Sequence, residues 1–514
     1  MRITQLLEQA THSRGQHTAT LCAGRERTWQ QLGQRIPRAA AALQALGLAA
    51  GDTVAVLAMN SDNYIETFFA VPWAGGVLAP LNIRWSVQEN HYALADSRAS
   101  FLLVDEGFVE QARQLAARLP DLKRIIYIGQ GPAPADMPGY EQLIEQYPAI
   151  ADNGRADDDL YVIFYTGGTT GHPKGVAMSH RAIYFSALSY LGMLNHTRHL
   201  RHIYVPGFFH FAAASPVWYI TLSGGTHIVL PKFEMQSFMQ GVNQHRATNT
   251  VLVPTMINML MNHPEFSQYD LSSLKTCIYG GSPMPEALMQ RAIELLPDWE
   301  FRQIYGMTET GGFATMLHWE DHTPQANRIK SAGQPAPGVS VRIIDAEGAP
   351  VAANVLGEIS IRSSALMDGY LNNPDSTQAV LRDGWMHTGD AGYLDDQGFL
   401  FVADRYKDMI VSGGENVYSI EVERVLYLHP AVQEAAVIGV PHEQWGESVH
   451  ALVVLRQGAQ ATAQELMQFC REHIAGYKIP RSIDFQDQPL PTTAVGKIRK
   501  NVIRDQCLER LGKH

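Results

Sequence analysis

A glycine- and threonine-rich stretch at residues 165–175, Tyr-Thr-Gly-Gly-Thr-Thr-Gly-His-Pro-Lys-Gly, carries residue types that suit a polyphosphate. Glycines let backbone N–H groups approach phosphate oxygens closely, threonine hydroxyls add hydrogen-bond donors, and Lys174 supplies positive charge. An apolar run at residues 161–164 precedes the stretch and a helix-like pattern opens near residue 179, so we predict the order strand, loop, helix. The alternative is an ordinary surface turn. A Walker loop ends in Gly-Lys followed by Ser or Thr, whereas Pro173 precedes Lys174 here, which excludes a P-loop NTPase.

Residues 304–311, Ile-Tyr-Gly-Met-Thr-Glu-Thr-Gly, place an aromatic ring, hydroxyls and a carboxylate directly after a predicted strand. Open α/β sheets bind their ligands beyond the carboxyl ends of the strands. In that position Tyr305 would stack on a nucleobase, and Glu309 would hold Mg²⁺, which prefers carboxylate and phosphate oxygens. Taken alone, the stretch suits a structural turn equally well.

Two further polar stretches lie in the last third of the chain. Residues 387–393 present Asp390 in a tight turn, where its carboxylate would accept both hydroxyls of a ribose or simply cap its own turn. Residues 491–500 form a basic loop in which Lys497 follows a glycine. This lysine would reach an anionic reaction centre, although such a tail is more often a solvated surface.

The elements that must position these residues follow an α/β pattern. Apolar strand-like runs alternate with amphipathic helical segments through residues 53–128, which predicts a parallel sheet buried on both faces. A second series runs from residue 161 to about residue 304, so we expect two stacked βα sheets. Residues 339–362 alternate apolar and polar side chains with period two, which predicts a small β-barrel-like subdomain with one wet face.

A smaller α+β unit follows the charged stretch at residues 404–408. A helical pattern and two strand-like runs come first, and Thr462 with Glu465 then forms a capping box that starts another helix. A chain of 514 residues is long enough for about two to four domains. We predict a large N-terminal domain at residues 1–406 and a small, mobile C-terminal domain at residues 407–514.

Composition excludes several classes of function. The net charge of −11 and the lack of a dense basic run argue against a nucleic-acid partner. The N-terminus lacks the build of a signal peptide, and prolines and glycines break the most hydrophobic window, residues 64–83, so we expect a cytoplasmic protein without a transmembrane segment. The cysteines lack metal-type spacing and fit buried, reduced thiols: Cys22, Cys277, Cys470 and Cys507. The sequence gives no indication of oligomeric state.

In this order and with these separations, the polar stretches resemble the AMP-forming acyl-adenylate superfamily of acyl-CoA synthetases, peptide-synthetase adenylation domains and luciferases. The resemblance covers nearly the whole chain and is closest to bacterial fatty-acyl-CoA synthetases. One departure is Gly167, where the family commonly has serine or threonine. The similar segments, in chain order, are residues 165–175, 305–309, 388–390, 404–408 with 413–416, and Lys497.

The resemblance implies an enzyme that uses ATP, Mg²⁺ and coenzyme A. A carboxylate attacks the α-phosphorus of ATP to give an acyl-AMP and pyrophosphate, and a thiol then takes the acyl group. Thr166 and Glu309 would orient the magnesium ion. The pyrophosphate end of ATP would be held by Thr166, Gly167, Gly168, Thr169, Thr170, Gly171 and Lys174. The remaining nucleotide contacts would come from Gly281, Ser282, Tyr305, Gly306, Thr308, Asp390 and Arg405.

The resemblance also implies roles in catalysis and in domain alternation. Lys497 would bridge the substrate carboxylate and the α-phosphate, and His210 would lie beside that carboxylate. Lys407 would be the hinge that absorbs the backbone rotation of the small domain between the two half-reactions. In the second half-reaction Gly414 would border the tunnel for the CoA thiol, because glycine permits close backbone approach.

The substrate acid is expected to carry an uncharged tail. Amino-acid-activating relatives pair the α-ammonium with an aspartate, but residues 206–223 contain no aspartate or glutamate, and an unpaired buried charge is costly. The apolar and small pocket candidates favour a medium- or long-chain fatty acid, with an aryl acid of cinnamate or benzoate type as the alternative. Ala214 stands where some long-chain relatives carry a gating tryptophan, so chain length stays open. The candidates are Phe211, Ala212, Ala213, Ala214, Trp218, Met307, Gly311, Gly312 and Phe313.

Other functions of the same scaffold stay open. An acyl-AMP ligase would load a carrier protein instead of CoA, a luciferase-like enzyme would oxidise its adenylate, and an inactive relative would only bind. No long insertion of the kind that disfavours CoA transfer precedes residue 407. The intact motifs argue against an inactive relative.

Overall fold

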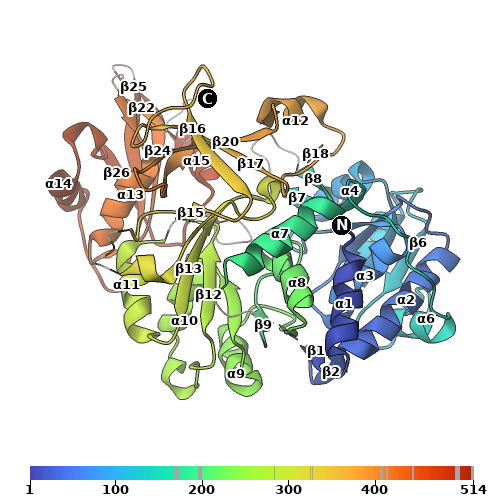
Figure 1. Cartoon of the computed structure of the whole chain (residues 1–514). Helices are drawn as coiled ribbons and strands as arrows, with labels where there is room; N and C mark the ends of the chain where they lie inside the picture. The colour runs from blue at the N-terminus through green and yellow to red at the C-terminus, as the bar shows by residue number, and fades with distance from the viewer. Residues whose placement is uncertain are drawn as a thin grey trace.

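The computed structural model is an α/β protein whose strands form four sheets (Figure 1). It describes residues 1–510 except 167–172, 195–198, 283, 324–325, 327, 406–408, 413–414, 443–444 and 493–497, and the side chains of residues 404, 405, 411, 415 and 416 are also outside the described part. Sheets of seven, nine and five strands precede residue 406, and a second five-stranded sheet follows it. The predicted α/β class, with a large N-terminal part and a smaller C-terminal part, is confirmed.

The seven-stranded sheet has the order β18-β8-β7-β4-β3-β5-β6. Its parallel strands are β3 (Thr53–Leu57), β4 (Val77–Pro80), β5 (Ala99–Val104), β6 (Arg124–Tyr127) and β7 (Leu160–Thr166). The helices that connect them are α3 (Asp62–Trp73), α4 (Val87–Asp96), α5 (Val109–Ala116) and α6 (Tyr140–Gln146). Strands β3, β4 and β5 are buried at every residue, as their continuous apolar sequences predict for a sheet that is covered on both faces.

Two details of this sheet differ from the order that the sequence predicts. Strand β7 does not start the second sheet, because it pairs in parallel with β4 through Leu78 and Val162. The glycine-rich stretch is followed by a strand, β8 (Lys174–Ser179), which pairs antiparallel with β7, and only then by helix α7 (His180–Gly192). An apolar run identifies a strand, but its neighbour in the sheet depends on residues far away in the sequence.

The nine-stranded sheet has the order β15-β14-β13-β12-β11-β9-β10-β1-β2. Its parallel strands are β1 (Thr18–Cys22), β9 (Arg201–Tyr204), β10 (Thr226–Val229), β11 (Asn249–Leu252), β12 (Thr276–Gly280) and β13 (Glu300–Tyr305). The antiparallel edge strands are β2 (Arg25–Thr28), β14 (Thr315–Leu317) and β15 (Gln334–Pro335). The remaining helices of this part are α1 (Thr4–Arg14), α2 (Trp29–Ala45), α8 (Phe211–Ser223), α9 (Met235–His245), α10 (Pro254–Met261) and α11 (Glu286–Leu295).

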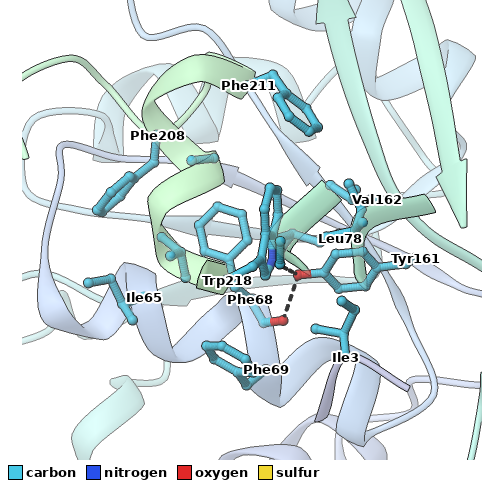
Figure 2. Packing of buried hydrophobic residues seen from close by; sticks show 14 of the residues in the cluster. Ile3, Ile65, Phe68, Phe69, Leu78, Tyr161, Val162, Phe208, Phe211 and Trp218 are labelled. Atoms are coloured by element: carbon cyan, nitrogen blue, oxygen red, sulfur yellow. Dashed lines mark hydrogen bonds between the residues drawn. The ribbon is translucent and has the colours of Figure 1, made fainter. Parts of the chain in front are cut away.

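Side chains of the two large sheets and of the helices between them share one hydrophobic core (Figure 2). Trp218 of α8 is fully buried, and its indole Nε1–H donates to the hydroxyl of Tyr161 in β7 at 2.8 Å. The Tyr161 hydroxyl in turn donates to the backbone carbonyl of Phe68 in α3 at 2.9 Å. Both polar groups are therefore satisfied inside the core, and the prediction of two stacked βα sheets is confirmed.

A five-stranded antiparallel sheet packs against this core. Its strands are β16 (Val339–Ile344), β17 (Gly357–Ser363), β19 (Leu381–Arg382), β20 (Trp385–Leu394) and β21 (Leu400–Arg405). The short strand β18 (Gly369–Tyr370) and helix α12 (Pro374–Val380) leave it and reach the edge of the seven-stranded sheet, where β18 pairs with β8. Ile343, Ile359 and Ile361 are buried in the shared core, as the period-two alternation predicts.

The C-terminal part is a separate α+β unit, drawn in orange to red in Figure 1. Its elements are β22 (Ile410–Ser412), β23 (Glu415–Val417), α13 (Ser419–Leu428), β24 (Val432–His442), β25 (Gly446–Leu455), α14 (Ala463–His473), β26 (Ser482–Gln486) and α15 (Lys500–Arg510). The predicted capping box is present, since Glu465 N–H donates to the Thr462 hydroxyl at 3.2 Å and Thr462 N–H donates to the Glu465 carboxylate at 2.7 Å. The boundary predicted between residues 406 and 407 lies outside the described residues and stays a prediction.

Two smaller expectations concern the cysteines and the membrane. All four cysteines are free and buried. Among the described residues, no helix combines the length and the apolar composition needed to cross a bilayer.

Candidate active site

The predicted site residues of the nine-stranded sheet follow the carboxyl ends of neighbouring parallel strands. Gly280 of β12 lies opposite Ile304 of β13, so the Gly281–Ser282 pair leaves the sheet beside Tyr305, the last residue of β13. Gly281 has a φ of +78°, a conformation that glycine adopts without strain. This edge of a parallel sheet is where open α/β folds bind ligands.

Tyr305 and Asp390 meet although they are far apart in the sequence. The Tyr305 hydroxyl donates to Asp390 Oδ2 at 2.8 Å, and Asp390 is only 6% exposed. Asp390 lies within strand β20, where its register with the neighbouring strands is irregular, and the tight turn predicted for it from the sequence is wrong. The Thr388 hydroxyl donates to the Ile359 carbonyl at 2.7 Å and accepts from the Asp390 N–H at 3.1 Å. The structure thus brings together an aromatic ring and a carboxylate that the sequence assigns to one nucleotide pocket.

Glu309 lies in a short 3₁₀ turn, Thr308–Thr310, just beyond β13. The residue is 9% exposed, and its Oε1 accepts a hydrogen bond from the Tyr370 hydroxyl at 3.0 Å. The turn ends at Gly311, whose φ is +73° and where a Cβ atom would lie 2.7 Å from the Ala365 side chain. Only glycine fits such a position, so the turn holds Glu309 in one place.

Thr166 and Lys174 frame the glycine-rich stretch. They lie opposite one another as the last pair of the β7–β8 ladder, and the residues between them, 167–172, are outside the described part of the chain. Lys174 Nζ donates to the Ser376 hydroxyl at 3.2 Å and lies 4.7 Å from the centre of the Tyr370 ring. The Tyr165 hydroxyl donates to Asp96 at 2.8 Å, and burial next to this carboxylate raises the pKa of Tyr165.

A divalent cation fits Glu309, because the Tyr370 hydroxyl binds Oε1 and the carboxylate has a second oxygen to offer to a metal ion. Among the described residues, no group of three or more His, Cys, Asp or Glu side chains has the arrangement of a metal site. Mg²⁺ is usually held by one or two carboxylates together with phosphate and water oxygens. Glu309, with the Thr166 hydroxyl, therefore suits a magnesium ion that arrives with a nucleotide.

His210 is the N-cap residue of α8 and follows β9 at the same sheet edge. Its neighbour Phe211 packs at 5.2 Å from the Phe164 ring, and a Cβ atom built on Gly312 would lie 2.5 Å from the Phe211 ring. The start of α8 and the segment after Glu309 are therefore in contact. Phe211 is 3% exposed.

Part of the predicted acid pocket belongs to the hydrophobic core instead. Ala213, Ala214 and Trp218 are 1%, 0% and 0% exposed. Ala214 and Trp218 belong to the hydrophobic core, in which Figure 2 shows Trp218, whereas Ala212 is exposed. Small residue size alone did not distinguish a pocket wall from close helix packing. The other predicted pocket residues lie at the start of α8 or in the segment after Tyr305: Phe211, Met307, Gly311, Gly312 and Phe313. Phe211 and Phe313 are 3% exposed and belong to the same core cluster, at its end next to Gly312.

Comparison with known proteins identifies the family. The sequence pattern of AMP-binding enzymes matches residues 7–371, and that of the AMP-binding enzyme C-terminal domain matches residues 421–497. The chain belongs to the AMP-binding enzyme family. This confirms the predicted superfamily, and the chain is an AMP-forming ligase.

Several AMP-binding enzymes are similar over almost their entire length. The fatty acid–[acyl-carrier-protein] ligase ScoC of Streptomyces coeruleorubidus is 36% identical over 514 residues, which cover 98% of this chain and 96% of that protein. The feruloyl-CoA synthase of an Amycolatopsis species is 38% identical over 488 residues, 95% of each chain. Among solved structures, the anthranilate CoA ligase AuaEII in complex with anthranoyl-AMP has a TM-score of 0.92 and 27% identity, and the match covers 100% of this chain and 98% of that one.

Some predicted residues of the AMP-binding enzyme cannot be placed. Lys407, Gly414 and Lys497 lie outside the described residues. The side chain of Arg405 is not described either, but its backbone lies opposite Asp390 in the β20–β21 ladder. The assigned roles of these residues stay predictions.

Tyr370 and Ser376 contact the candidate site residues Glu309 and Lys174, and the sequence analysis does not indicate either of them. They belong to β18 and α12, which reach the phosphate-loop lysine only through the pairing of β18 with β8. The Gly-Tyr pair at residues 369–370 lies in a region that reads as a loop, and no local pattern indicates which strand it joins.

Proposed function

We propose that this AMP-binding enzyme activates an uncharged carboxylic acid with ATP and transfers the acyl group to coenzyme A. The observation that carries the proposal is the group of side chains around the ends of β13 and β8. Glu309, Asp390 and Tyr305 offer contacts for a cation, a ribose and an adenine, and Lys174 lies at the end of the phosphate loop. Together they suit a nucleoside triphosphate.

In the first half-reaction, an oxygen of the substrate carboxylate attacks the α-phosphorus, and the bond to pyrophosphate breaks. Lys174 and the loop at residues 167–172 hold the departing pyrophosphate, while Asp390 and Tyr305 hold the nucleoside. A magnesium ion at Glu309 would neutralise phosphate charge. Because the protein acts here mainly through positioning and charge stabilisation, these contacts account for most of its contribution. Lys497 stabilises the charge at the α-phosphate.

In the second half-reaction, the CoA sulfur attacks the acyl carbon and the bond to AMP breaks. The free acid cannot take this route because oxide is a poor leaving group, whereas AMP leaves readily. The proposed boundary at residues 406–407 allows the C-terminal part to rotate between the two half-reactions, with Lys407 as the hinge and Gly414 beside the CoA thiol.

The aromatic side chains between the start of α8 and the segment after Glu309, where we propose that the acyl group binds, favour a compact, flat acid. Phe211 fills the space beside Gly312, and the Tyr190 and Phe313 rings lie 4.1 Å apart, centre to centre, behind it. Aromatic rings that pack at offset or tilted angles suit another ring. We therefore place an aryl or arylpropenoic acid before a medium- or long-chain fatty acid, in line with the similarity to a feruloyl-CoA synthase.

A carrier protein is the second candidate for the acceptor, because the ScoC relative is named for transfer to an acyl-carrier protein. In that case the first half-reaction is unchanged, and the acyl group passes to a protein-bound pantetheine thiol.

Both parts of the proposal are tested by measuring pyrophosphate release with and without CoA across a panel of acids. The panel contains benzoate, cinnamate, ferulate, hexanoate, dodecanoate and palmitate, and mass spectrometry identifies the thioester. We expect acid-dependent release, a CoA thioester, and the highest kcat/KM for an arylpropenoic acid. Release without a CoA thioester, restored by an acyl-carrier protein, would establish the second candidate.

Glu309→Gln supplies the matched negative variant, with Glu320→Gln as the control at an exposed glutamate nearby in the sequence. Glu309→Gln should lower pyrophosphate release by about 100-fold, because it removes a charge-stabilising group, and Glu320→Gln should not change it. Equal activity of the two variants, or no acid-dependent release by the wild type, would contradict the proposal.

A further inference from the structure

Tyr370 touches two oppositely charged residues of the proposed ATP site. Its hydroxyl donates to Glu309 Oε1 at 3.0 Å, and its ring centre lies 4.7 Å from Lys174 Nζ. Glu309 follows a strand of the nine-stranded sheet, and Lys174 begins β8 of the seven-stranded sheet. One aromatic side chain thus connects the two sheets at the place where the nucleotide is proposed to bind.

We infer that Tyr370 is a positioning residue for magnesium–ATP, which fixes the Glu309 carboxylate through its hydroxyl and the Lys174 ammonium through its ring. The inference rests on the proposed function, since it assumes that Glu309 faces the cation and Lys174 the phosphates. Nothing in the sequence pattern assigns this tyrosine a role.

The backbone of Tyr370 is held firmly enough to act as a support. Its N–H donates to the Thr377 hydroxyl at 2.8 Å, and Tyr370 lies opposite Val176 in the β18–β8 ladder. A Cβ atom on Gly369 would lie 2.9 Å from the Thr377 methyl group, so the close approach of the two segments requires glycine there. Thr377 is itself fixed, because its hydroxyl donates to the Asn373 carbonyl at 2.9 Å.

The position of the ring also keeps the two charges available. Within the described residues, neither Lys174 nor Glu309 forms an ion pair, although both contact the same side chain. A direct Lys174–Glu309 pair would neutralise the charge that each must offer to a phosphate or a cation. A phenol donates to the carboxylate and attracts the ammonium through its π face, without a net charge of its own.

Ser376 completes the support on the lysine side. Lys174 Nζ donates to its hydroxyl at 3.2 Å, and the Ser376 N–H is bound by the Asn373 side chain at 3.0 Å. The ammonium is therefore oriented before a phosphate arrives, which lowers the entropy cost of binding.

Tyr370→Phe separates the two contacts, because it removes the hydroxyl from Glu309 and keeps the ring beside Lys174. The measurement is the Kd of the unreactive analogue α,β-methylene-ATP, by calorimetry, with Mg²⁺ and with EDTA. We expect binding with Mg²⁺ to weaken about 10-fold, the range of a lost hydrogen bond to a charged group, and binding in EDTA to stay unchanged. Tyr370→Leu removes the ring as well and should weaken binding under both conditions.

Tyr140→Phe is the matched control, since it also removes a tyrosine hydroxyl from a glutamate. The Tyr140 hydroxyl donates to Glu66 at 3.1 Å, between helices α6 and α3 of the N-terminal part. This variant should bind the analogue as the wild type does. The concentration of Mg²⁺ that gives half-maximal pyrophosphate release should rise in Tyr370→Phe and stay constant in Tyr140→Phe.

A double variant makes the result decisive. If Tyr370 acts through Glu309, adding Tyr370→Phe to Glu309→Gln should change the analogue Kd by less than about two-fold, because contacting residues are non-additive. Full additivity, or a Tyr370→Phe variant with unchanged Mg²⁺ dependence, would overturn the inference.

Should Tyr370→Phe not fold, Thr377→Val, which removes the partner of the Tyr370 N–H, undergoes the same test. Analogue binding by a wild type that releases no pyrophosphate with any acid would refute the proposed function alone.

Discussion

The Tyr305 hydroxyl lies 2.8 Å from Asp390 Oδ2 and donates a hydrogen bond to it, which joins the end of β13 to strand β20. In this arrangement the phenol satisfies a carboxylate that is 6% exposed. A ribose bound at Asp390 would bring hydroxyl donors of its own. Tyr305 then has to keep only its ring position, because the nucleotide replaces its hydrogen bond.

Substitutions of Tyr305 and of Asp390 should therefore change the KM for ATP by very different factors. Tyr305→Phe keeps the ring and should leave the KM for ATP close to the wild-type value, whereas Tyr305→Ala should raise it about 10-fold or more through lost stacking on the base. Asp390→Ala should raise it about 100-fold, because two charge-assisted hydrogen bonds are lost. Pyrophosphate release at varied ATP concentration measures these changes. Tyr393→Phe, in strand β20 with Asp390, is the control. An effect of Tyr305→Phe as large as that of Tyr305→Ala would contradict the stacking role of Tyr305.

The length of the acid pocket is predicted to depend on Phe211. Its ring occupies the space beside Gly312, so Phe211→Leu should admit longer tails. We expect the ratio of kcat/KM for dodecanoate over cinnamate to rise about 10-fold, which is the range for small changes in an apolar pocket. Phe301→Leu removes a ring of the same size from a separate hydrophobic cluster around α9 and α11, and it should leave the ratio unchanged. An unchanged kcat/KM ratio in Phe211→Leu would show that the tail of the acid does not bind beside Phe211.

Substitution of Lys497 should affect the first half-reaction much more than the second. Lys497→Ala should lower acyl-AMP formation by at least about 100-fold, since it removes a charge that stabilises the α-phosphate in the transition state. Thioester formation from chemically prepared acyl-AMP and CoA should be little affected, because that step begins after the α-phosphate bond has broken. Arg499→Gln is the control for a nearby exposed cation. Near-normal pyrophosphate release by Lys497→Ala would refute the assignment.

Local chemistry explains which parts of the fold were predictable. The helix at Ser419–Leu428 and the capping box at Thr462 depend on residues within one or two turns, and both are present as predicted. The neighbours of β7 were not predictable, because Val162 pairs with Leu78 across a large separation in sequence. An apolar strand carries no information about which of several apolar strands it joins.

The same distinction applies to the candidate site. The sequence indicates Tyr305, Glu309 and Asp390 as candidates because each lies in a short polar motif, and their roles stay predictions. Tyr370 was missed because its position depends on β18 pairing with β8, which is a tertiary contact. Trp218 was misjudged as a pocket residue because an apolar side chain on a helix suits a pocket and a core equally, and only its burial against Tyr161 distinguishes them.

Two buried histidines in strands β9 and β10 predict how stability depends on pH. Burial lowers the pKa of His202 and of His227 to about 3, from an ordinary value of 6.5. The Tyr204 hydroxyl lies 2.7 Å from His227 Nδ1, and the Thr221 hydroxyl lies 3.3 Å from Nε2. A neutral ring satisfies both neighbours, since it accepts from Tyr204 and donates to Thr221, whereas a second ring proton would lose its acceptor.

The sign of the pH effect follows from these pKa values. Between pH 6.5 and about 3 the unfolded chain binds protons that the folded chain does not, so stability falls as pH falls, by up to ~1.4 kcal/mol per pH unit for each histidine. Urea unfolding at pH 7.0 and 5.0 measures the loss. His227→Gln removes one of these titrations and should shrink the difference between the two pH values, whereas His473→Gln, at an exposed position, should not. A wild-type loss that His227→Gln leaves unchanged would show that His227 is already charged in the folded protein.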